Sequence, residues 1–159
     1  MKLEEYAALL KGEYKEKFDA FRALLLEYNA RYNLTTILEE KDMFYKHFLD
    51  SVAGEKFFPK NAKVIEIGSG AGFPSIPLKL LRDDLSFTLV ESVGKKCEFL
   101  HAVVDNLGLS NVNIYFCNTR VSVDRFSTYT QILHIFIHRD LVGYTPLKKT
   151  LKPLIYKAF

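Results

Sequence analysis

The chain has 159 residues, enough for one domain with a substantial hydrophobic core. Its 22 Lys and Arg against 19 Asp and Glu give a net charge of +3, which permits an RNA partner without requiring one. Cys97 and Cys117 form neither a CxxC pair nor a disulfide framework, so we expect a reducing cytoplasm and no structural metal. No basic-then-apolar leader opens the chain, and the longest apolar stretches, such as Ile132–Ile137, are far below the roughly 20 residues of a membrane span.

Residues 1–60 have the periodicity of helices. Apolar side chains recur at steps of three and four, and we expect this stripe to pack into the core. The stripe consists of Leu3, Tyr6, Leu9, Leu10, Phe18, Phe21, Leu25, Tyr28 and Tyr32. Asn33 and Thr35 end the pattern, and a further helix is predicted from about 41 to 52. The region is therefore predicted to form a helical cap on a sheet.

Polar side chains gather on one face of the predicted helix at 41–52. They are His47, Asp50 and Ser51, with Gly54 just beyond the helix. From spacing alone, a solvated face with local hydrogen bonds explains the pattern best. No other ligand cluster joins His47, so the pattern predicts no metal site.

A glycine-rich stretch, VIEIGSGAGFPSIP, occupies 64–77. An apolar run at 64–67, interrupted by Glu66, precedes glycines at the alternate positions 68, 70 and 72. The pattern predicts a buried parallel strand, a tight turn and then a helix opened by Pro74 or Pro77. Open α/β sheets bind ligands outside the carboxyl ends of such strands, where glycine lets a ligand approach the backbone.

A second apolar run, FTLVE at 87–91, ends in Glu91 about 20 residues after the glycines. At this spacing an acidic side chain meets the diol of a ribose. The glycines and the acid together predict a nucleoside-containing cofactor, either NAD or S-adenosylmethionine. A bulky Phe73 directly follows the last glycine and no later glycine completes the dinucleotide fingerprint, which argues mildly against NAD.

From residue 63 onward, apolar runs alternate with helical segments, the pattern of βαβ units around a parallel sheet. Strands are expected near 63–67, 86–91, 112–116 and 131–137, and helices near 75–82, 94–107 and 143–152. We therefore predict one structural domain, with a helical region at 1–60 packed on an α/β core at 61–159.

Four segments, in this order and spacing, resemble the small-subunit ribosomal RNA methyltransferase G family, also called glucose-inhibited division protein B. They are NLTTI (33–37), KHFLDSV (46–52), IEIGSGAGFPSIPL (65–78) and TLVESVGKKCEFL (88–100). The resemblance covers the first two-thirds to three-quarters of the chain. It implies a Rossmann-like methyltransferase that uses S-adenosylmethionine to methylate N7 of a guanine in the decoding region of 16S rRNA.

The resemblance also implies a set of cofactor-binding residues. They are Gly68, Ser69, Gly70, Gly72, Phe73, Glu91, Ser92, Val121, Ser122 and Arg139. Ser122 stands where the family usually has an acid, and Arg139 matches the arginine of a Ser-Arg-Ala segment whose flanking residues differ here. Arg139 could instead contact the RNA backbone or form an ordinary surface ion pair.

A second set is implied for RNA contact or for support of the site. His47, Asp50 and Ser51 match an HxxDS segment that lies beside the cofactor loop in the family. Basic side chains are expected to hold phosphates, although lysines are often only solvated. They are Lys95, Lys96, Arg120, Arg139 and Lys157.

No catalytic side chain is predicted. Guanine N7 presents an in-plane lone pair to the sulfonium methyl, so the displacement needs no general base and rests on orientation.

The chain ends soon after a fifth strand candidate at 154–156, where this class normally continues with a helix and an antiparallel strand pair. We therefore expect these C-terminal strands to be missing and an exposed sheet edge to favour self-association. The alternative function is a cofactor-binding or ribosome-associated relic without methyl transfer. An NAD-dependent oxidoreductase is a third hypothesis.

Overall fold

The computed structural model describes residues 2–117, 131–134 and 155–156. Their strands form one sheet in the order β3-β2-β1-β4-β5. The strands are β1 (Lys63–Ile67), β2 (Ser86–Glu91), β3 (Val112–Phe116), β4 (Gln131–His134) and β5 (Ile155–Tyr156). β1 to β4 run parallel, whereas β5 pairs antiparallel with β4. The predicted α/β, Rossmann-like fold is confirmed.

The first three strands have the bounds predicted from the sequence. The fourth is described only to His134, and the helix predicted at 143–152 lies outside the described residues. The last strand candidate is present as the short β5. Self-association through a sheet edge stays a prediction.

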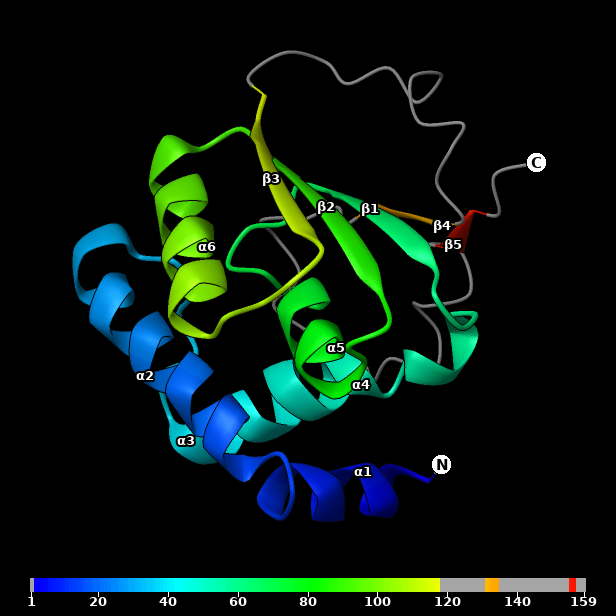
Figure 1. The fold of residues 1–159 in the computed structure, drawn as a ribbon. Coiled ribbons are helices and arrows are strands. Elements are labelled where there is room, and N and C mark those ends of the chain that lie inside the picture. The colour runs from blue at the N-terminus through cyan, green and yellow to red at the C-terminus, as the bar shows by residue number, and fades with distance from the viewer. Residues whose placement is uncertain (1, 118–130, 135–154, 157–159) are drawn as a thin grey trace.

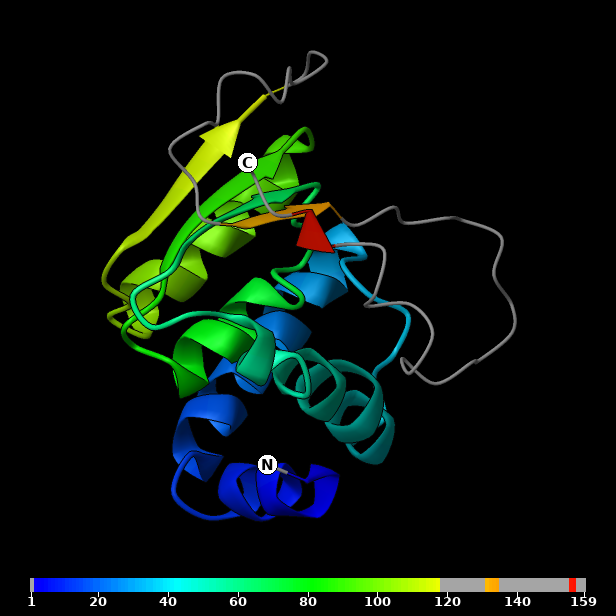
Figure 2. The ribbon, with the colours of Figure 1, turned by 90° about the vertical axis from the view of Figure 1, so that its right-hand side faces the viewer.

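The described helices lie on one face of the sheet (Figures 1 and 2). α5 (Ser75–Leu81) and α6 (Gly94–Asn106) connect the parallel strands and pack against Val64, Phe87 and Leu89. The opposite face carries Ile65 and Val90 in a separate small cluster. The face under the helices therefore holds the main core.

The N-terminal helices cover α5 and α6. They are α1 (Leu3–Lys11), α2 (Lys15–Tyr32), α3 (Glu40–Met43), a π-helix (Phe44–Leu49), α4 (Asp50–Val52) and a 3-10 helix (Glu55–Phe57). The predicted apolar stripe is largely confirmed, since most of its members are buried, although Leu3 is 53% exposed. None of the described helices is long and apolar enough to cross a membrane.

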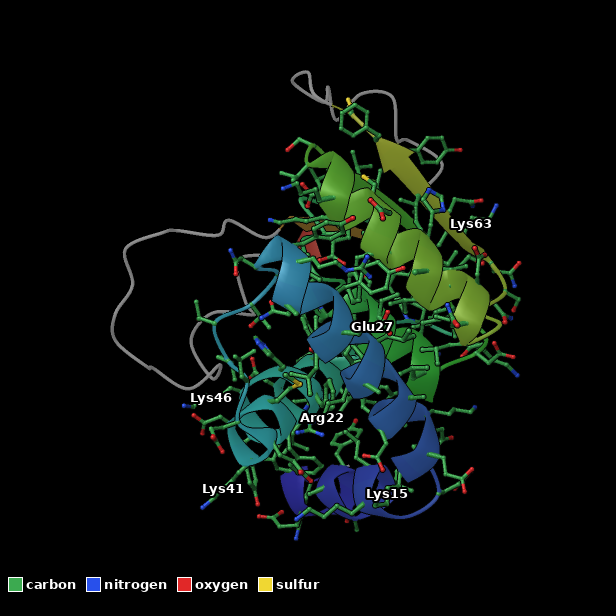
Figure 3. The ribbon with its side chains drawn as sticks, turned by 90° about the vertical axis from the view of Figure 1, so that its left-hand side faces the viewer. Lys15, Arg22, Glu27, Lys41, Lys46 and Lys63 are labelled. Carbon is green, nitrogen blue, oxygen red and sulfur yellow. The ribbon has the colours of Figure 1, made fainter. Side chains whose placement is uncertain are left out.

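Aromatic rings join the N-terminal helices to the core. Phe18 and Phe21 of α2 contact Phe48 of the π-helix at centroid distances of 5.1 and 5.8 Å. Phe21 also stacks on Phe99 of α6 at 6.3 Å. The outer edge of these helices is polar: Figure 3 shows Lys41 and Lys46 pointing away from α2. The ring contacts thus anchor the cap to the core, and its charged outer edge faces the solvent.

The expected helix at 41–52 is helical, but its middle widens into the π-helix. A π-helical turn holds more residues than an α-helical turn, so the three-and-four spacing no longer predicts which side chains share a face. Ser51 is buried and both His47 and Asp50 are half-buried. The expectation of a solvated polar face was wrong because this face packs against the rest of the chain, whereas the expected local hydrogen bonding is present between Ser51 Oγ and His47 O.

A polar network fixes the end of the cap at the amino-terminal edge of the sheet. The Arg82 guanidinium donates to Asp84 at 2.6 and 2.8 Å and also to Glu55. The Tyr6 hydroxyl donates to the other oxygen of Glu55 at 2.9 Å. Burial and this hydrogen bond raise the pKa of Tyr6 to about 12. The network lies at the opposite edge from the glycine turn, so it holds the cap without occupying that turn.

Candidate functional site

The glycine stretch forms the tight turn that the sequence predicted between β1 and α5. Gly68, Gly70 and Gly72 have φ values of 79°, 58° and 80°. Gly68 N–H donates to Val90 O at 2.8 Å, which ties the start of the turn to β2. At the other end, Ile76 N–H donates to Gly72 O at 2.7 Å and begins α5. The turn therefore lies at the carboxyl edge of the sheet between β1 and β2.

Gly72 has a packing role in this turn. A Cβ added there would lie 2.5 Å from Ile76 Cγ1 and 3.0 Å from Leu100 Cδ2. These atoms belong to α5 and α6, so the missing side chain lets both helices approach the turn. A side chain at this position would therefore point into the core rather than toward a ligand.

Glu91, the last residue of β2, holds the turn from the side. Its buried carboxylate accepts Gly70 N–H at 2.7 Å through Oε2. Its Oε1 accepts the N–H groups of Ser92 and Val93 at 2.8 and 2.9 Å. Hydrogen bonds to an ionised acceptor are among the stronger ones in proteins. The structure thus brings Glu91 to the glycines, as the spacing predicted, while its contact with a ribose stays a prediction.

Phe73 holds the turn from the other side. Its ring stacks on the His47 imidazole, with centroids 4.4 Å apart and planes 15° from parallel. It also contacts Phe21 and Phe48 at 5.4 and 6.1 Å. The residue that departs from the dinucleotide fingerprint therefore connects the turn to the helical cap. A contact with a cofactor stays a prediction.

His47 is itself fixed by the NLTTI segment. Its Nε2 lies 3.0 Å from Thr35 Oγ1, and Asn29 Oδ1 accepts Thr35 N–H at 2.8 Å. Burial lowers the pKa of His47, so the neutral imidazole dominates near pH 7. Three segments singled out in the sequence, at 33–37, 46–52 and 65–78, thus meet at this ring.

Asp50 and Ser51 lie just beyond the histidine. Ser51 Oγ donates to His47 O at 2.5 Å, a bond within the helix. The Asp50 carboxylate forms no hydrogen bond or ion pair within the described part of the chain, and burial raises its pKa to about 6. Of the two, only Ser51 acts directly on the backbone that carries His47.

Glu66 was not predicted as a site residue. It is fully buried in β1, and its Oε2 is hydrogen-bonded to Ser75 Oγ in the first turn of α5. Burial, with a smaller effect of nearby Glu91, raises its pKa to about 8, so the carboxyl keeps its proton at neutral pH. Its signal in the sequence was an acid inside an apolar run, two residues before the first glycine.

Two buried polar atoms beside this turn have no partner within the described residues. They are Oε1 of Glu66 and Oγ of Ser69. Buried polar groups are nearly always hydrogen-bonded, so these atoms are suited to a ligand that carries hydroxyl or amino groups. Glu91 Oε2 accepts one N–H and keeps capacity for a further donor.

The remaining predicted residues divide into two groups. Ser92 and Lys95 are exposed and Lys96 is half-buried, all near the start of α6 at the same sheet edge as the turn. Five residues lie outside the described part of the chain: Arg120, Val121, Ser122, Arg139 and Lys157. For those five, the sequence predictions stand untested.

Comparison with known proteins gives a consistent result. The family model for rRNA small subunit methyltransferase G matches residues 14–157. A Staphylococcus epidermidis protein named ribosomal RNA small subunit methyltransferase G is 36% identical over 159 residues, covering 99% of this chain and 66% of that protein. A Streptococcus pyogenes protein of the same name is 41% identical over 116 residues, covering 71% and 49%. The chain thus spans less than two thirds of the length of these curated relatives.

The fold also resembles a solved structure. Coclaurine N-methyltransferase, bound to N-methylheliamine and SAH, superposes with a TM-score of 0.50 at 19% identity. The match covers 64% of this chain and 28% of that one. At this identity the likeness concerns the fold alone.

The packing of Gly72 can be tested with a matched pair of alanine variants. Gly72→Ala is expected to lower the free energy of unfolding by about 2 to 4 kcal/mol, because of its positive φ and the close Ile76 and Leu100 atoms. Gly94→Ala is the control, since its Cβ would meet nothing within 4 Å and alanine favours the helix. Urea denaturation measures both. Equal stabilities of the two variants would contradict the packing role.

The protonation of Glu66 can be tested through the pH dependence of stability. The folded state holds a proton between about pH 4.5 and 8 that the unfolded state releases, so the free energy of unfolding falls as pH rises through this window. This group contributes a slope of about −1.4 kcal/mol per pH unit there. Glu66→Gln should remove that slope and be more stable than the wild type near pH 7. The exposed Glu27→Gln should keep the wild-type slope, and an unchanged slope in Glu66→Gln would refute the assignment.

Proposed function

This chain belongs to the rRNA small subunit methyltransferase G family, and from this premise we propose that it is a cytoplasmic S-adenosylmethionine-dependent rRNA methyltransferase. Its proposed substrate is N7 of a guanine in the decoding region of 16S rRNA, in free rRNA or in the small ribosomal subunit. The observation that carries the proposal is the contact between Glu91 and Gly70, which joins the acid and the glycine turn at one sheet edge.

The proposed cofactor site is built from this turn. Glu91 has acceptor capacity for the ribose hydroxyls, and Gly70 presents backbone beside it. The unpartnered polar atoms of Glu66 and Ser69 suit the amino-acid end of the cofactor. Val121, Ser122 and Arg139 are proposed to complete the site from outside the described residues.

The chemistry of the proposed reaction needs positioning more than proton transfer. S-adenosylmethionine, when bound, supplies a methyl group on a positively charged sulfur. Guanine N7 already has its lone pair, so no residue of the chain has to remove a proton. The protein's contribution is orientation, which supplies several kcal/mol when reacting atoms are held about 3 Å apart.

The helical cap is proposed to take part in that orientation. His47 stacks on Phe73, and Ser51 bonds to the backbone of His47, so these residues hold the turn in place. Asp50, on the same segment, is proposed to face RNA or to support the turn. A shift of the cap would therefore be expected to disturb the cofactor site.

The charge distribution of the sequence supports an RNA partner. Residues 118–159 contain seven Lys and Arg but only two Asp and Glu. We propose that Arg120, Arg139 and Lys157 contact phosphates, together with Lys95 and Lys96 of α6. Such contacts make affinity depend on salt.

The role of Glu91 can be tested by calorimetry with S-adenosylhomocysteine. Glu91→Ala should weaken binding by about 1 to 3 kcal/mol, because it removes the acceptor for the ribose and for Gly70 N–H. The exposed Asp105→Ala of α6 serves as the control and should bind as the wild type does. Circular dichroism separates lost binding from lost folding. Wild-type affinity in a folded Glu91→Ala protein would remove this residue from the site.

The function is tested by two measurements on one preparation. Calorimetric titration with S-adenosylhomocysteine is followed by transfer of a labelled methyl group to unmodified 30S subunits. Binding with transfer supports the enzyme, and binding without transfer supports the non-catalytic relative. A folded sample that fails to bind would overturn the cofactor assignment, and competition by NAD would favour the oxidoreductase.

A further inference from the structure

The end of α2 and the start of α6 lie side by side (Figure 1). The Tyr32 hydroxyl, on the last residue of α2, donates to both carboxylate oxygens of Glu98 at 2.8 and 2.9 Å. Lys95 Nζ lies 5.6 Å from the centre of the Tyr32 ring, and the Arg31 guanidinium lies 5.8 Å from it. We call this surface the α2–α6 patch. It consists of Arg31, Tyr32, Lys95, Lys96 and Glu98.

The two lysines of the patch have no carboxylate partner within 4.0 Å among the described residues. Both occupy the first turn of α6, where a positive charge opposes the helix dipole by a few tenths of a kcal/mol. Arg31, in contrast, is paired with Glu27 at 3.6 Å. Neither the helix dipole nor an ion pair therefore explains why both Lys95 and Lys96 stand here, whereas a bound anion would; Lys95 has in addition its contact with the Tyr32 ring.

The ring of Tyr32 is suited to stacking. Its hydroxyl is held by Glu98, so the orientation of the ring is fixed before any ligand arrives. The ring is only half-buried. Fixed, accessible aromatic faces beside cations are the usual elements of surfaces that bind single-stranded nucleic acids.

The patch adjoins the proposed cofactor site. Val93, whose N–H donates to Glu91 at 2.9 Å, precedes Lys95 by two residues. A nucleic-acid strand that lies across the patch would therefore run beside the glycine turn.

From these contacts we propose that the α2–α6 patch binds a single-stranded segment of the RNA substrate. A phosphate binds Lys95 and Lys96 and draws the Lys95 ammonium away from the ring, and a base then stacks on Tyr32. The proposal rests on the proposed function in taking RNA as the substrate, and it adds a stacking residue from the helical cap.

The test is a binding assay that requires no methyl transfer. Fluorescence anisotropy follows a labelled single-stranded RNA of about 12 nucleotides at several salt concentrations. Tyr32→Leu should weaken binding about tenfold and leave the salt dependence unchanged. Lys95→Gln should lower the slope of log affinity against log salt by about 0.7, the value for one phosphate contact on a single strand. Tyr32→Phe keeps the ring and should bind within about twofold of the wild type.

The chain offers a matched control at the other end of α2. Lys17 Nζ lies 5.6 Å from the centre of the Tyr14 ring, the same distance as in the patch, but this pair belongs to the start of α2, which lies beside α1 (Figure 1). Tyr14→Leu and Lys17→Gln should therefore keep both the affinity and the salt slope. Thermal unfolding confirms that each variant is folded.

Calorimetry with S-adenosylhomocysteine on the same samples separates the two proposals. Suppose that the wild type binds both S-adenosylhomocysteine and the RNA. If the folded patch variants then bind the RNA no more weakly than the controls do, the proposal for the patch is overturned and the proposed function stands. Failure of the wild type to bind the RNA also overturns the patch. Loss of RNA binding confined to the patch variants supports it, even if S-adenosylhomocysteine fails to bind.

Discussion

The hydrogen bond from Gly70 N–H to the Glu91 carboxylate is the contact on which the site depends. It joins the turn after β1 to the end of β2, and the same carboxylate closes the turn into α6 through Ser92 and Val93. One buried charge thus sets the relative position of two connections. Burial is the main reason that Glu66 in the neighbouring strand stays protonated, with a smaller contribution from Glu91, and Glu66 Oε2 accepts a hydrogen bond from Ser75 Oγ.

The turn is held equally from the side of the helical cap. Phe73 inserts among rings of α2 and the π-helix, and its closest ring contact is His47. This histidine is in turn fixed by Thr35. The cap is therefore part of the site's construction rather than a separate covering, since Phe73, which follows the last glycine, makes its ring contacts with residues of the cap.

The sequence was a good guide where local pattern decides structure. The runs at 63–67, 86–91 and 112–116 are apolar, short and bounded by turn residues, so their strands could be placed correctly. The π-helix could not, because a periodic pattern assumes a constant turn. The stacking of His47 on Phe73 and the cation–π contact between Lys95 and Tyr32 could not be predicted either, since these contacts depend on how segments distant in the sequence pack. Glu66 was visible in the sequence as an acid within an apolar run, but only its burial in the structure shows that it belongs to the site.

Positive and negative side chains are distributed unevenly along the chain, although its net charge is only +3. Residues 1–117 contain 15 Lys and Arg against 17 Asp and Glu, so the excess of positive charge lies wholly in residues 118–159. The body that carries the glycine turn is therefore slightly acidic, and a polyanion would gain nothing from it on average. Attraction at this edge has to come from particular side chains. Lys95 and Lys96, which have no carboxylate partner among the described residues, are proposed as such side chains, and the ring of Tyr32 beside Lys95 would orient the phosphate contact.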